Sequence, residues 1–279
     1  MKINHNEELS KYTTIRIGGT AENFYIPESV EELNEIITTK KNVVFIGGGS
    51  NLLIAERKFE NVVSLREFNK KLEACGNGVF KVGASVRLQK LINTINEEGY
   101  GGIEYLFSVP GLVGGAIVMN AGRGKTHNQG ISDYICSVTV LKNGKIIKMN
   151  KSECNFSYRN SVFKNNMDYL VIEVEFKFPK QSFAESLRKK NERIDLCKRL
   201  QDNSKPNFGT VFFVSNNKIM KLVKKAGLHS GNAGFSTKTQ NWIVSGNAKF
   251  SDVLKLIKKV QMIHRICGKK AIPEVIIWE

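Results

Sequence analysis

The sequence is poor in the side chains from which metal sites and disulfide frameworks are built. Its 279 residues include only four His and five Cys. No two His lie at the spacing of metal ligands and no Cys-x-x-Cys pair occurs, so we expect no metal site. The cysteines are odd in number and widely scattered, which is typical of reduced thiols, and we expect a cytoplasmic protein. They are Cys75, Cys136, Cys154, Cys197 and Cys267.

Long apolar stretches are also absent. No run of about 18 uncharged apolar residues occurs, which argues against a membrane span. The opening "MKINHNEELSKYTTIRIGG" lacks the apolar core of a signal peptide. We therefore expect no membrane partner. An apolar fraction of 41% and 16 Phe are enough for a folded core, and a chain of this length most often forms two or three domains.

Acidic residues are few beside basic ones. There are 26 Asp and Glu against 42 Lys and Arg, which gives a net charge of +16. Such an excess is compatible with nucleic-acid binding. The basic residues, however, are spread over several helical patterns, where a solvated face is the common outcome, and no aromatic-interleaved basic motif accompanies them. We therefore expect no nucleic-acid partner and favour a small anionic ligand.

Two helices are predicted in the first half of the chain. Residues 29–37 open with Ser29 and Glu32 as a capping box and continue with apolar residues on one face. A strand that ends at Gly83 is followed by the second helix. Its cap is predicted at Ser85, and its apolar residues recur at i, i+3, i+4 and i+7.

Strand patterns follow further along. "ICSVTVLKNGKIIKM" (135–149) predicts a hairpin, because Asn143-Gly144 is the favoured pair for a type I′ turn. "YLVIEVEFKF" (169–178) alternates in polarity and predicts a further strand. The charged stretch 182–206 is helical at first and then turn-like, which indicates a crossing between domains.

The remainder predicts a small α+β domain of about 90 residues. One helix covers about 217–226 and ends at Gly227. The other covers about 252–266, with Ser251 as its cap and Gly268 after its end. A strand-like "NWIVSG" lies between them, and "PEVIIW" closes the chain.

Three consecutive glycines, Gly47, Gly48 and Gly49, directly follow the apolar run "VVFI". Such a cluster at a strand end lets backbone N–H groups approach a phosphate. It is not a P-loop, because Ser50 and Asn51 stand where that loop needs Lys and Ser or Thr. It is not a Rossmann fingerprint either, because a second apolar run follows too soon for a helix. A tight turn without a ligand is the alternative that the residues leave open.

"SVPGLVGGAIVMNAGRGKTHNQG" (108–130) is a second glycine-rich segment. Backbone this bare can lie along a flat or extended ligand and supply N–H groups to it. A buried loop packed through its glycines is an equally good alternative. Two such segments in one domain favour a large ligand with a pyrophosphate and a ring, such as a dinucleotide cofactor. The glycines are Gly111, Gly114, Gly115, Gly122 and Gly124.

Two charged residues have unusual neighbours in the sequence. Arg159 follows Tyr158 amid aromatic and small polar residues, where a guanidinium favours carboxylate binding or stabilisation of developing negative charge. Glu274 lies between Pro273 and an apolar run, so its carboxylate would be partly buried in a strand. A carboxylate of that kind is either paired or suited to acid–base work. A surface position for Arg159 is its alternative.

Eight segments, taken in order, match one known family: "TTIRIGGTAENFYIP" (13–27), "GGGSNLL" (47–53), "VGAS" (82–85), "GIEYLFSVPGLVGGAIVMNAG" (102–122), "FSYRNSVFK" (156–164), "KLVKKAGL" (221–228), "NWIV" (241–244) and "PEV" (273–275). The chain resembles the UDP-N-acetylenolpyruvoylglucosamine reductases, also called UDP-N-acetylmuramate dehydrogenases, which are FAD enzymes of peptidoglycan synthesis. The resemblance covers nearly the whole chain. Its short length is similar to the compact branch of the family, which lacks an inserted loop.

The resemblance implies an α+β fold with a vanillyl-alcohol-oxidase-type (PCMH-type) FAD-binding domain. This domain would cover 1–180, in two α+β subdomains of about 1–65 and 66–180. A smaller C-terminal α+β substrate domain would cover 181–279, with its last strand (about 272–279) returning toward the flavin.

FAD is the cofactor that the resemblance implies, with NADPH as hydride donor. The glycine triplet would hold the FAD pyrophosphate, and the second glycine-rich segment would lie along the rest of the cofactor. The cofactor-binding residues implied are Gly47, Gly48, Gly49, Ser50, Asn51, Ala84, Ser85, Ser108, Pro110, Gly111, Gly114, Gly115, Asn120, Ala121 and Gly122.

The implied reaction reduces the enolpyruvyl double bond of a UDP-sugar to a lactyl group. Hydride addition at carbon 3 leaves negative charge on carbon 2 and its carboxylate, which Arg159 and a protonated Glu274 would stabilise. Thr210 stands at the position of the family's proton-donating Ser. The substrate-binding residues implied are Tyr158, Arg159 and Lys238. We expect a monomer whose partners are the UDP-sugar and NADPH.

The match is weaker in the substrate half. Thr210 replaces the family's Ser, and Phe213 and Val214 replace a Lys and an Asn. Gly234 stands where a substrate-binding Gln is usual, and Thr239 where a His is usual. A flavin oxidoreductase with a different enol or sugar substrate, or a flavin-binding protein without reductase activity, is therefore the alternative.

Overall fold

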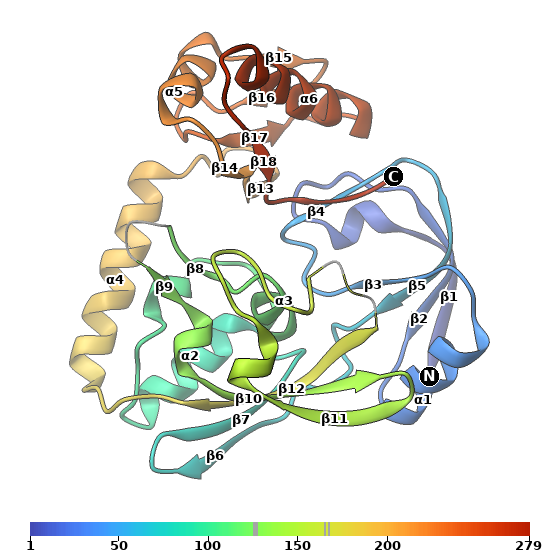
Figure 1. Cartoon of the computed structure of the whole chain (residues 1–279), viewed down its shortest axis with the longest axis vertical. Helices are drawn as coiled ribbons and strands as arrows, with labels where there is room; N and C mark the ends of the chain where they lie inside the picture. The colour runs from blue at the N-terminus through green and yellow to red at the C-terminus, as the bar shows by residue number, and fades with distance from the viewer. Residues whose placement is uncertain (125–127, 165, 167) are drawn as a thin grey trace. The chain divides into compact units, whose positions relative to one another are not determined.

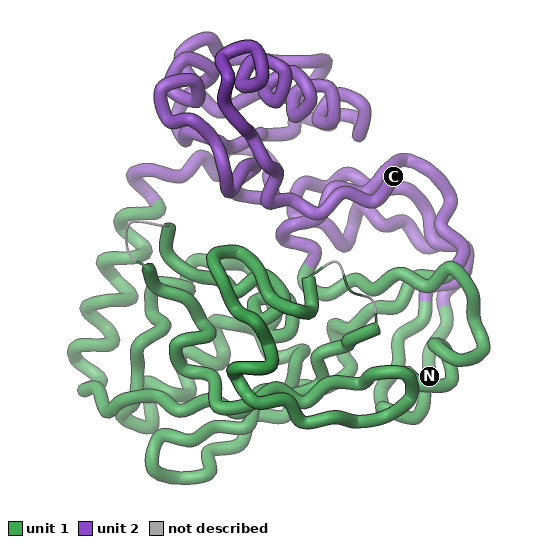
Figure 2. The backbone as a smooth tube through the Cα atoms, viewed as in Figure 1, with its two compact units in different colours: residues 1–3, 25–48, 61–197 green, residues 4–24, 49–60, 198–279 purple. Residues whose placement is uncertain are grey.

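The structure, a computed structural model, describes residues 1–124, 128–164, 166 and 168–279. Its backbone divides into two compact units (Figure 2). Unit 1 comprises Met1–Ile3, Tyr25–Gly48 and Asn61–Cys197, and unit 2 comprises Asn4–Phe24, Gly49–Glu60 and Lys198–Glu279. Backbone compactness does not test which segments bind which ligand, so the functional domain limits given above stay a prediction.

The larger sheet of unit 1 contains β6 (Leu72–Gly76), β7 (Val79–Gly83), β10 (Ile135–Lys142), β11 (Lys145–Asn150) and β12 (Tyr169–Lys177). All neighbours are antiparallel, in the order β11-β10-β12-β7-β6 (Figure 1). The predicted hairpin is confirmed, because Asn143 and Gly144 have φ of 49° and 78° and so form the left-handed pair of a type I′ turn. The strand predicted at 169–178 is confirmed as β12.

Two helices, α2 (Leu88–Glu97) and α3 (Val113–Val118), share a hydrophobic core with this sheet. The helix predicted after Gly83 is thus present, but its cap at Ser85 is wrong, since the N-cap is Arg87. The Ser85 hydroxyl instead donates to the carbonyl oxygen of Leu65 and accepts from the N–H of Asn69. The Ser85 side chain is therefore bound to the loop at 65–69 and does not cap the helix.

A second sheet has the strand order β1-β2-β5-β3, formed by β1 (Lys2–Glu8), β2 (Thr20–Ile26), β3 (Val43–Ile46) and β5 (Lys58–Ser64). The pair β3–β5 is parallel. The predicted cap of α1 (Val30–Thr39) is confirmed, because the Ser29 hydroxyl accepts from the N–H of Glu32. The apolar face of α1 belongs to a core with residues of β3, β5 and β12.

The charged stretch after β12 forms α4 (Phe183–Leu200), followed by irregular backbone. In unit 1 this helix buries Lys190, whose Nζ donates to Oδ1 of Asn93 on α2 at 3.1 Å. The division between the units falls between Cys197 and Lys198, within α4. Short elements complete the described chain: η1 (Leu9–Tyr12), η2 (Glu104–Leu106), η4 (Ile131–Tyr134), η5 (Lys151–Cys154), β8 (Gly122–Arg123) and β9 (Gln129–Gly130).

Unit 2 contains a four-stranded antiparallel sheet with α5 (Asn217–Ala226) and α6 (Phe250–Ile266). Its strands, in the order β13-β17-β16-β15, are β13 (Asn207–Thr210), β15 (His229–Ser230), β16 (Ala233–Phe235) and β17 (Trp242–Ser245). Both predicted helices are confirmed, and Gly227 ends α5 with φ of 56°.

The cap predicted at Ser251 is wrong. Helix α6 begins at Phe250 with Lys249 as its N-cap, and the carboxylate of Asp252 accepts from the N–H of Lys249 at 3.1 Å. The Asp252 carboxylate thus binds the N-cap backbone, and Ser251 lies inside the first turn instead of before it.

The core of unit 2 joins distant parts of the chain. Ile15, Ile17 and Leu53 pack with α6 and with β17 in one hydrophobic cluster. Two strand pairs also belong to this unit: β14 (Phe212–Val214) with β18 (Ile272–Pro273), and β4 (Leu52–Ile54) with β19 (Ile276–Trp278). Over the described residues, no helix has the length and apolarity that crossing a bilayer requires.

Candidate functional site

Gly47 and Gly48 follow β3 and lie against the second glycine-rich segment. A Cβ added to Gly48 would lie 3.3 Å from the Cα of Gly111, so two backbones meet here without side chains between them. Arg66 holds the loop by its carbonyl oxygens, with Nε 3.0 Å from that of Gly47 and Nη2 3.2 Å from that of Gly48. No described group accepts a hydrogen bond from the N–H of either glycine. The amides are thus available to an anion.

The predicted segment Ala84-Ser85 runs beside the same stretch. The N–H of Gly114 donates to the carbonyl oxygen of Ala84 at 2.8 Å, and that of Leu88 donates to Gly111 at 3.1 Å. The N–H groups of Ala84 and Ser85 themselves donate to carbonyl oxygens within unit 1. This segment therefore shapes the glycine-rich stretch, and its two amides are already occupied.

Tyr158 and Arg159 form the tip of a tight turn, with Arg159 in the left-handed region at φ 55°. Two guanidinium nitrogens of Arg159 donate to the carbonyl oxygens of Asn120 (3.4 Å) and Gly122 (2.9 Å). The guanidinium carbon lies 5.4 Å from the centroid of the Tyr158 ring. The structure thus brings predicted substrate residues directly onto predicted cofactor residues.

Asn120 links this turn to the rest of unit 1. Its Nδ2 donates to the carbonyl oxygen of Ser157 at 2.9 Å, and its Oδ1 accepts from the N–H of Ser132 at 3.3 Å. Ala121 follows with its N–H bonded to the carbonyl oxygen of Ala116. The predicted residues Asn120, Ala121 and Gly122 are therefore a packed connection that carries Arg159.

Sequence reasoning missed two arginines of unit 1, Arg66 and Arg193. Arg193 lies on α4, and its Nε donates to the hydroxyl of Ser108 at 2.8 Å, two residues before the exposed Pro110. Each arginine holds a predicted cofactor segment. The chain has 42 basic residues, so one more Arg does not stand out in the sequence. The only sign that Arg66 could reach the glycine triplet is its place directly after the apolar run 62–65.

In unit 2, Gly49 is required by both space and conformation. Its φ is 68°, and an added Cβ would lie 1.7 Å from the carbonyl oxygen of Tyr12. Its own carbonyl oxygen accepts from the N–H of Thr14 at 3.1 Å. Gly49 therefore has a packing reason to be glycine in addition to any part in binding. Ser50, the next residue, is half-buried.

Thr210 and Glu274 lie close together in unit 2. The N–H of Glu274 donates to the carbonyl oxygen of Val211, the neighbour of Thr210, at 2.7 Å. The carbonyl oxygen of Glu274 accepts from Nδ2 of Asn51 at 3.0 Å. Thr210 is exposed and Glu274 is half-buried. Asn51, predicted as a cofactor residue, thus touches a predicted catalytic residue.

Lys238 and Thr239 contact the last turn of α4 and the chain that follows it. Nζ of Lys238 donates to the carbonyl oxygen of Lys198 at 3.0 Å. The Thr239 hydroxyl donates to the carbonyl oxygen of Leu200 at 2.7 Å and accepts from the N–H of Asp202 at 2.6 Å. Thr239 therefore has a structural role here, because its hydroxyl joins the end of α4 to Asp202.

The Asp202 carboxylate accepts hydrogen bonds from the hydroxyls of Ser204 and Ser236 in this loop. Hydrogen bonds from Ser204 and then from Ser236 lower the pKa of its carboxyl group, and the Ser236 hydroxyl lies 2.6 Å away. Nearby, an added Cβ on Gly234 would lie 3.7 Å from the nearest atom, in His229, which is an ordinary van der Waals contact.

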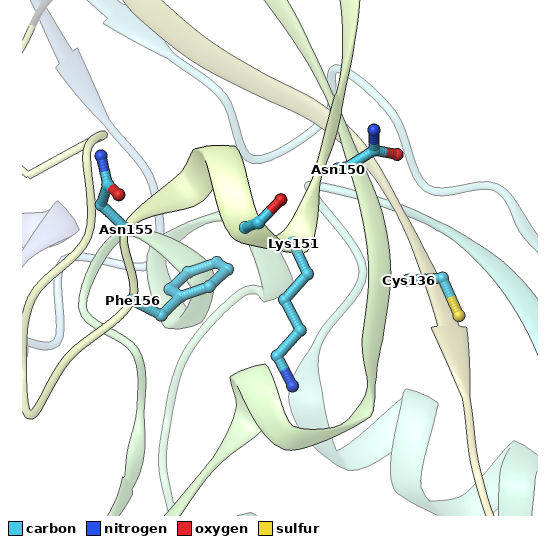
Figure 3. Close-up of a pocket in the computed structure, with 6 residues that line it drawn as sticks. Cys136, Asn150, Lys151, Asn155 and Phe156 are labelled. Atoms are coloured by element: carbon cyan, nitrogen blue, oxygen red, sulfur yellow. The ribbon is translucent and has the colours of Figure 1, made fainter.

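A separate hollow of about 710 Å³ lies in unit 1 (Figure 3). It is lined by Cys136, Asn150, Lys151, Ser152, Asn155 and Phe156. None of the predicted site residues is among them. The hollow therefore contributes nothing to the site built above.

The glycine-rich backbone and its match to a known domain define the class of protein. Residues 21–150 match the family described as FAD binding domain. The whole chain is similar to the crystal structure of UDP-N-acetylenolpyruvylglucosamine reductase from Thermus caldophilus, with a TM-score of 0.81 and 28% identity, over 100% of this chain and 98% of that one. The predicted α+β fold with a PCMH-type FAD-binding domain is confirmed.

Curated relatives carry the same name. The UDP-N-acetylenolpyruvoylglucosamine reductase of Carboxydothermus hydrogenoformans is 36% identical over 92% of this chain and 87% of its own length. Reductase 1 of Bacillus cereus is 34% identical over 95% of this chain and 89% of its own. The chain belongs to the UDP-N-acetylenolpyruvoylglucosamine reductase family, as its sequence predicts.

Proposed function

We propose that this protein reduces UDP-N-acetylglucosamine enolpyruvate to UDP-N-acetylmuramate with FAD and NADPH, in the synthesis of peptidoglycan precursors. The observation that carries the proposal is the close approach of the two glycine-rich segments, where a Cβ added to Gly48 would lie 3.3 Å from the Cα of Gly111. The Arg159 guanidinium donates a hydrogen bond to Gly122, near the end of the second segment. Family membership supplies the substrate and the hydride donor.

The residues present fit FAD. The amides of Gly47 and Gly48 lack acceptors among the described residues, as a pyrophosphate site needs. A Cβ added to Gly115 would meet no described atom within 4 Å, so there is open space beside this backbone. The Tyr105 hydroxyl, three residues before Ser108, is buried without a described partner. Burial raises the pKa of Tyr105, so the phenol stays neutral and can donate.

Bound FAD supplies the two-electron chemistry that links NADPH oxidation to reduction of the enolpyruvyl double bond. The side chains of this protein would then handle charge and protons. Arg159, a permanent cation, would stabilise the negative charge that develops on carbon 2 and the carboxylate of the substrate. The Thr210 hydroxyl would give a proton to carbon 2, and a protonated Glu274 would hydrogen-bond the developing charge. Tyr158 and Lys238 are the further substrate contacts that we propose.

A second candidate keeps the flavin but changes the substrate. Phe213 and Val214 are apolar residues at positions where the family has Lys and Asn, and Gly234 replaces a Gln. Three polar contacts would thus be missing. A flavin oxidoreductase for a different enol or sugar is the function that these substitutions favour. We also propose that the protein is a cytoplasmic monomer, in line with its scattered cysteines.

The test is NADPH consumption by the purified protein with and without UDP-N-acetylglucosamine enolpyruvate. Oxidation that depends on the sugar supports the proposed reductase. A yellow protein that NADPH reduces, but whose reduced flavin ignores the sugar, supports the second candidate. A colourless protein that cannot be loaded with FAD would contradict both.

A further inference from the structure

Two asparagine side chains of unit 2 bind the backbone on which the proposed proton donors are carried. We propose that Asn241 and Asn51 are positioning residues, which hold Thr210 and Glu274 in register for protonation of the substrate. The inference rests on the proposed function, and it concerns residues that touch neither the reacting atoms nor each other's side chains.

Asn241 binds the backbone of a single residue, Phe212, at both its N–H and its carbonyl oxygen. Its Oδ1 accepts from the N–H of Phe212 at 3.1 Å, and its Nδ2 donates to the carbonyl oxygen of Phe212 at 2.7 Å. Its own carbonyl oxygen accepts from the N–H of Val211 at 2.9 Å. A side-chain amide can do this because it offers both an acceptor and a donor in one plane, whereas an ionised carboxylate only accepts. The residue sits at φ 64°, a conformation that Asn tolerates.

The strand ladder does not hold this stretch by itself. The pairing of β13 with β17 shifts register between Asn207 and Thr210, and Gly209 has φ of 79°. A bulge of this kind redirects the following side chain. On the other edge Phe212 pairs with Pro273, which has no N–H to donate. Asn241 supplies the hydrogen bonds that the interrupted ladder leaves out.

Asn51 extends these hydrogen bonds to Glu274, and we call the set formed by Asn241, Asn51 and the backbone that they bind the frame. Its Nδ2 donates to the carbonyl oxygen of Glu274 at 3.0 Å, and its own carbonyl oxygen accepts from the N–H of Ile276 at 3.0 Å. The N–H of Glu274 donates to the carbonyl oxygen of Val211 at 2.7 Å. Both sides of the Glu274 backbone are therefore fixed, one by Asn51 and the other by the stretch that Asn241 binds.

The consequence is a mechanical link between the proposed donors. If the Asn241 amide is removed, the backbone at 211–212 loses two hydrogen bonds, and the partner of the Glu274 N–H moves with it. A shift of about 1 Å at a reacting group can lower a rate by about 100-fold. Reduction of the flavin by NADPH needs neither proton donor, so only the second half-reaction should respond.

The variant to measure is Asn241→Gly, which keeps the left-handed backbone and removes the amide. Its matched control is Asn247→Gly, since Asn247 is exposed, has φ of 61° and lies outside the frame. In the FAD-loaded protein, rapid-mixing absorbance gives flavin reduction by NADPH and flavin reoxidation by UDP-N-acetylglucosamine enolpyruvate separately. We expect about 10- to 100-fold slower reoxidation in Asn241→Gly, with flavin reduction and FAD content within twofold of wild type.

Asn241→Asp sharpens the result. It keeps the acceptor for the Phe212 N–H but replaces the donor to its carbonyl oxygen with an acceptor. We expect partial loss of reoxidation if the frame acts through geometry. A solvent deuterium isotope effect on reoxidation that grows in both variants would indicate that protonation is the step affected. Reoxidation at the wild-type rate in Asn241→Gly would overturn the proposal.

Hydrogen exchange tests the frame apart from the chemistry. In Asn241→Gly, peptides covering 208–214 and 272–276 should both exchange faster, whereas Asn247→Gly should change neither. Unchanged exchange at 272–276 would overturn the frame even if catalysis falls. If the wild-type flavin is not reoxidised by this sugar, the proposed function fails, and the exchange result still decides whether Asn241 and the Glu274 backbone form one unit.

Discussion

The two compact units differ in the part of the chain that they use for binding. In unit 1 the predicted cofactor segments meet through bare backbone, at Gly48 and Gly111, and arginines hold them by carbonyl and hydroxyl oxygens. In unit 2 the candidate catalytic groups are side chains, the Thr210 hydroxyl and the Glu274 carboxylate, and Arg159 is the corresponding side chain of unit 1. A site made of backbone tolerates substitution as long as its glycines remain, whereas a site made of side chains changes with each residue. The departures that the resemblance implies, at Phe213, Val214 and Gly234, all lie in unit 2.

The charge distribution follows the same division. Residues 198–279 carry 15 Lys and Arg against four Asp and Glu, so they hold +11 of the chain's net charge of +16. The last part of unit 2 is thus strongly basic. A basic surface attracts strongly anionic ligands such as a UDP-sugar or NADPH over a distance of about 10 Å at moderate salt.

The largest expected effect is in unit 1. Gly48→Val should abolish FAD loading, because its Cβ would lie 3.3 Å from the Cα of Gly111 and its methyl groups would close the approach of the two backbones. Flavin absorbance per protein measures this. Gly234→Val, where the nearest atom is 3.7 Å away, is the matched control and should retain FAD. Full flavin content in Gly48→Val would remove the contrast between a backbone site and a side-chain site.

Glu274→Gln should be next in size. Gln keeps the backbone bonds to Val211 and Asn51 but is a weaker hydrogen-bond donor to the developing charge than a carboxylic acid, so flavin reoxidation by the UDP-sugar should fall by about 10²–10³-fold with FAD still bound. Arg159→Ala should show the same signature. Rapid-mixing absorbance separates the two half-reactions, and Glu279→Gln at the exposed chain end serves as control. A rate within threefold of wild type would take Glu274 out of the mechanism.

Thr210→Ser tests whether a threonine at this position is a poorer proton donor than a serine. Removing one methyl group beside the reacting carbon should raise reoxidation several-fold, by less than about 1.4 kcal/mol in activation free energy. Thr210→Val, which has the same shape without the hydroxyl, is the matched control and should be slower than wild type. Equal rates for Thr and Ser would mean that Thr210 is already a fully competent donor.

Gly234→Gln should restore a polar contact to the substrate. The space around Gly234 admits the side chain, and one hydrogen bond to an uncharged group is worth about 0.5–1.5 kcal/mol. We therefore expect KM for the UDP-sugar to fall several-fold, with little change in the KM for NADPH. Gly234→Leu provides the same bulk without the amide. An unchanged or higher KM would favour a different substrate for this chain.

The smallest effect concerns the loop that Thr239 and Asp202 join. Asp202→Asn should lower the free energy of unfolding by about 1 kcal/mol, which is roughly 2–4 °C in Tm for a unit of this size. Because hydrogen bonding lowers the pKa of Asp202 in the folded state, its contribution is present at neutral pH and is lost as acidification protonates it. The difference between wild type and variant should therefore shrink in thermal melts as the pH falls below the ordinary pKa of an aspartic acid, 3.8. A difference that persists at low pH would assign it to another cause.

The local parts of the fold could be predicted and the long-range parts could not. Asn143-Gly144 determines its own turn, and Gly227 ends its own helix, so both were accessible from adjacent residues. The caps at Ser85 and Ser251 were wrong because distant or alternative acceptors and donors satisfied those turns. The packing of Ile15 with residues of the C-terminal helices could not be predicted, because no pattern in the sequence around Ile15 indicates it.

The candidate site divides in the same way. Glycine clusters reveal a bare backbone in the sequence, and the resemblance supplied residues such as Arg159 and Glu274. Arg66 and Arg193 were missed because each is one basic residue among many, and only the folded chain shows which carbonyl or hydroxyl oxygen it reaches. The contact of Asn51 with Glu274 joins residues from opposite ends of the chain, so a motif reading of the glycine loop could assign Asn51 to the cofactor alone.

The core of unit 2 has a consequence for how the protein is made. Ile15, Ile17 and Leu53 share a hydrophobic cluster with residues of α6. They leave the ribosome early, and this cluster cannot be completed until α6, near the end of the chain, has been synthesised. At about 5–20 residues per second, that interval is roughly 10–40 s. During synthesis these apolar side chains have no native partner, and a ribosome that stalls before α6 would release a chain in which they stay exposed. The same arrangement rules out producing the C-terminal segment 181–279 alone with its full core, because three of its buried side chains are encoded near the start of the message.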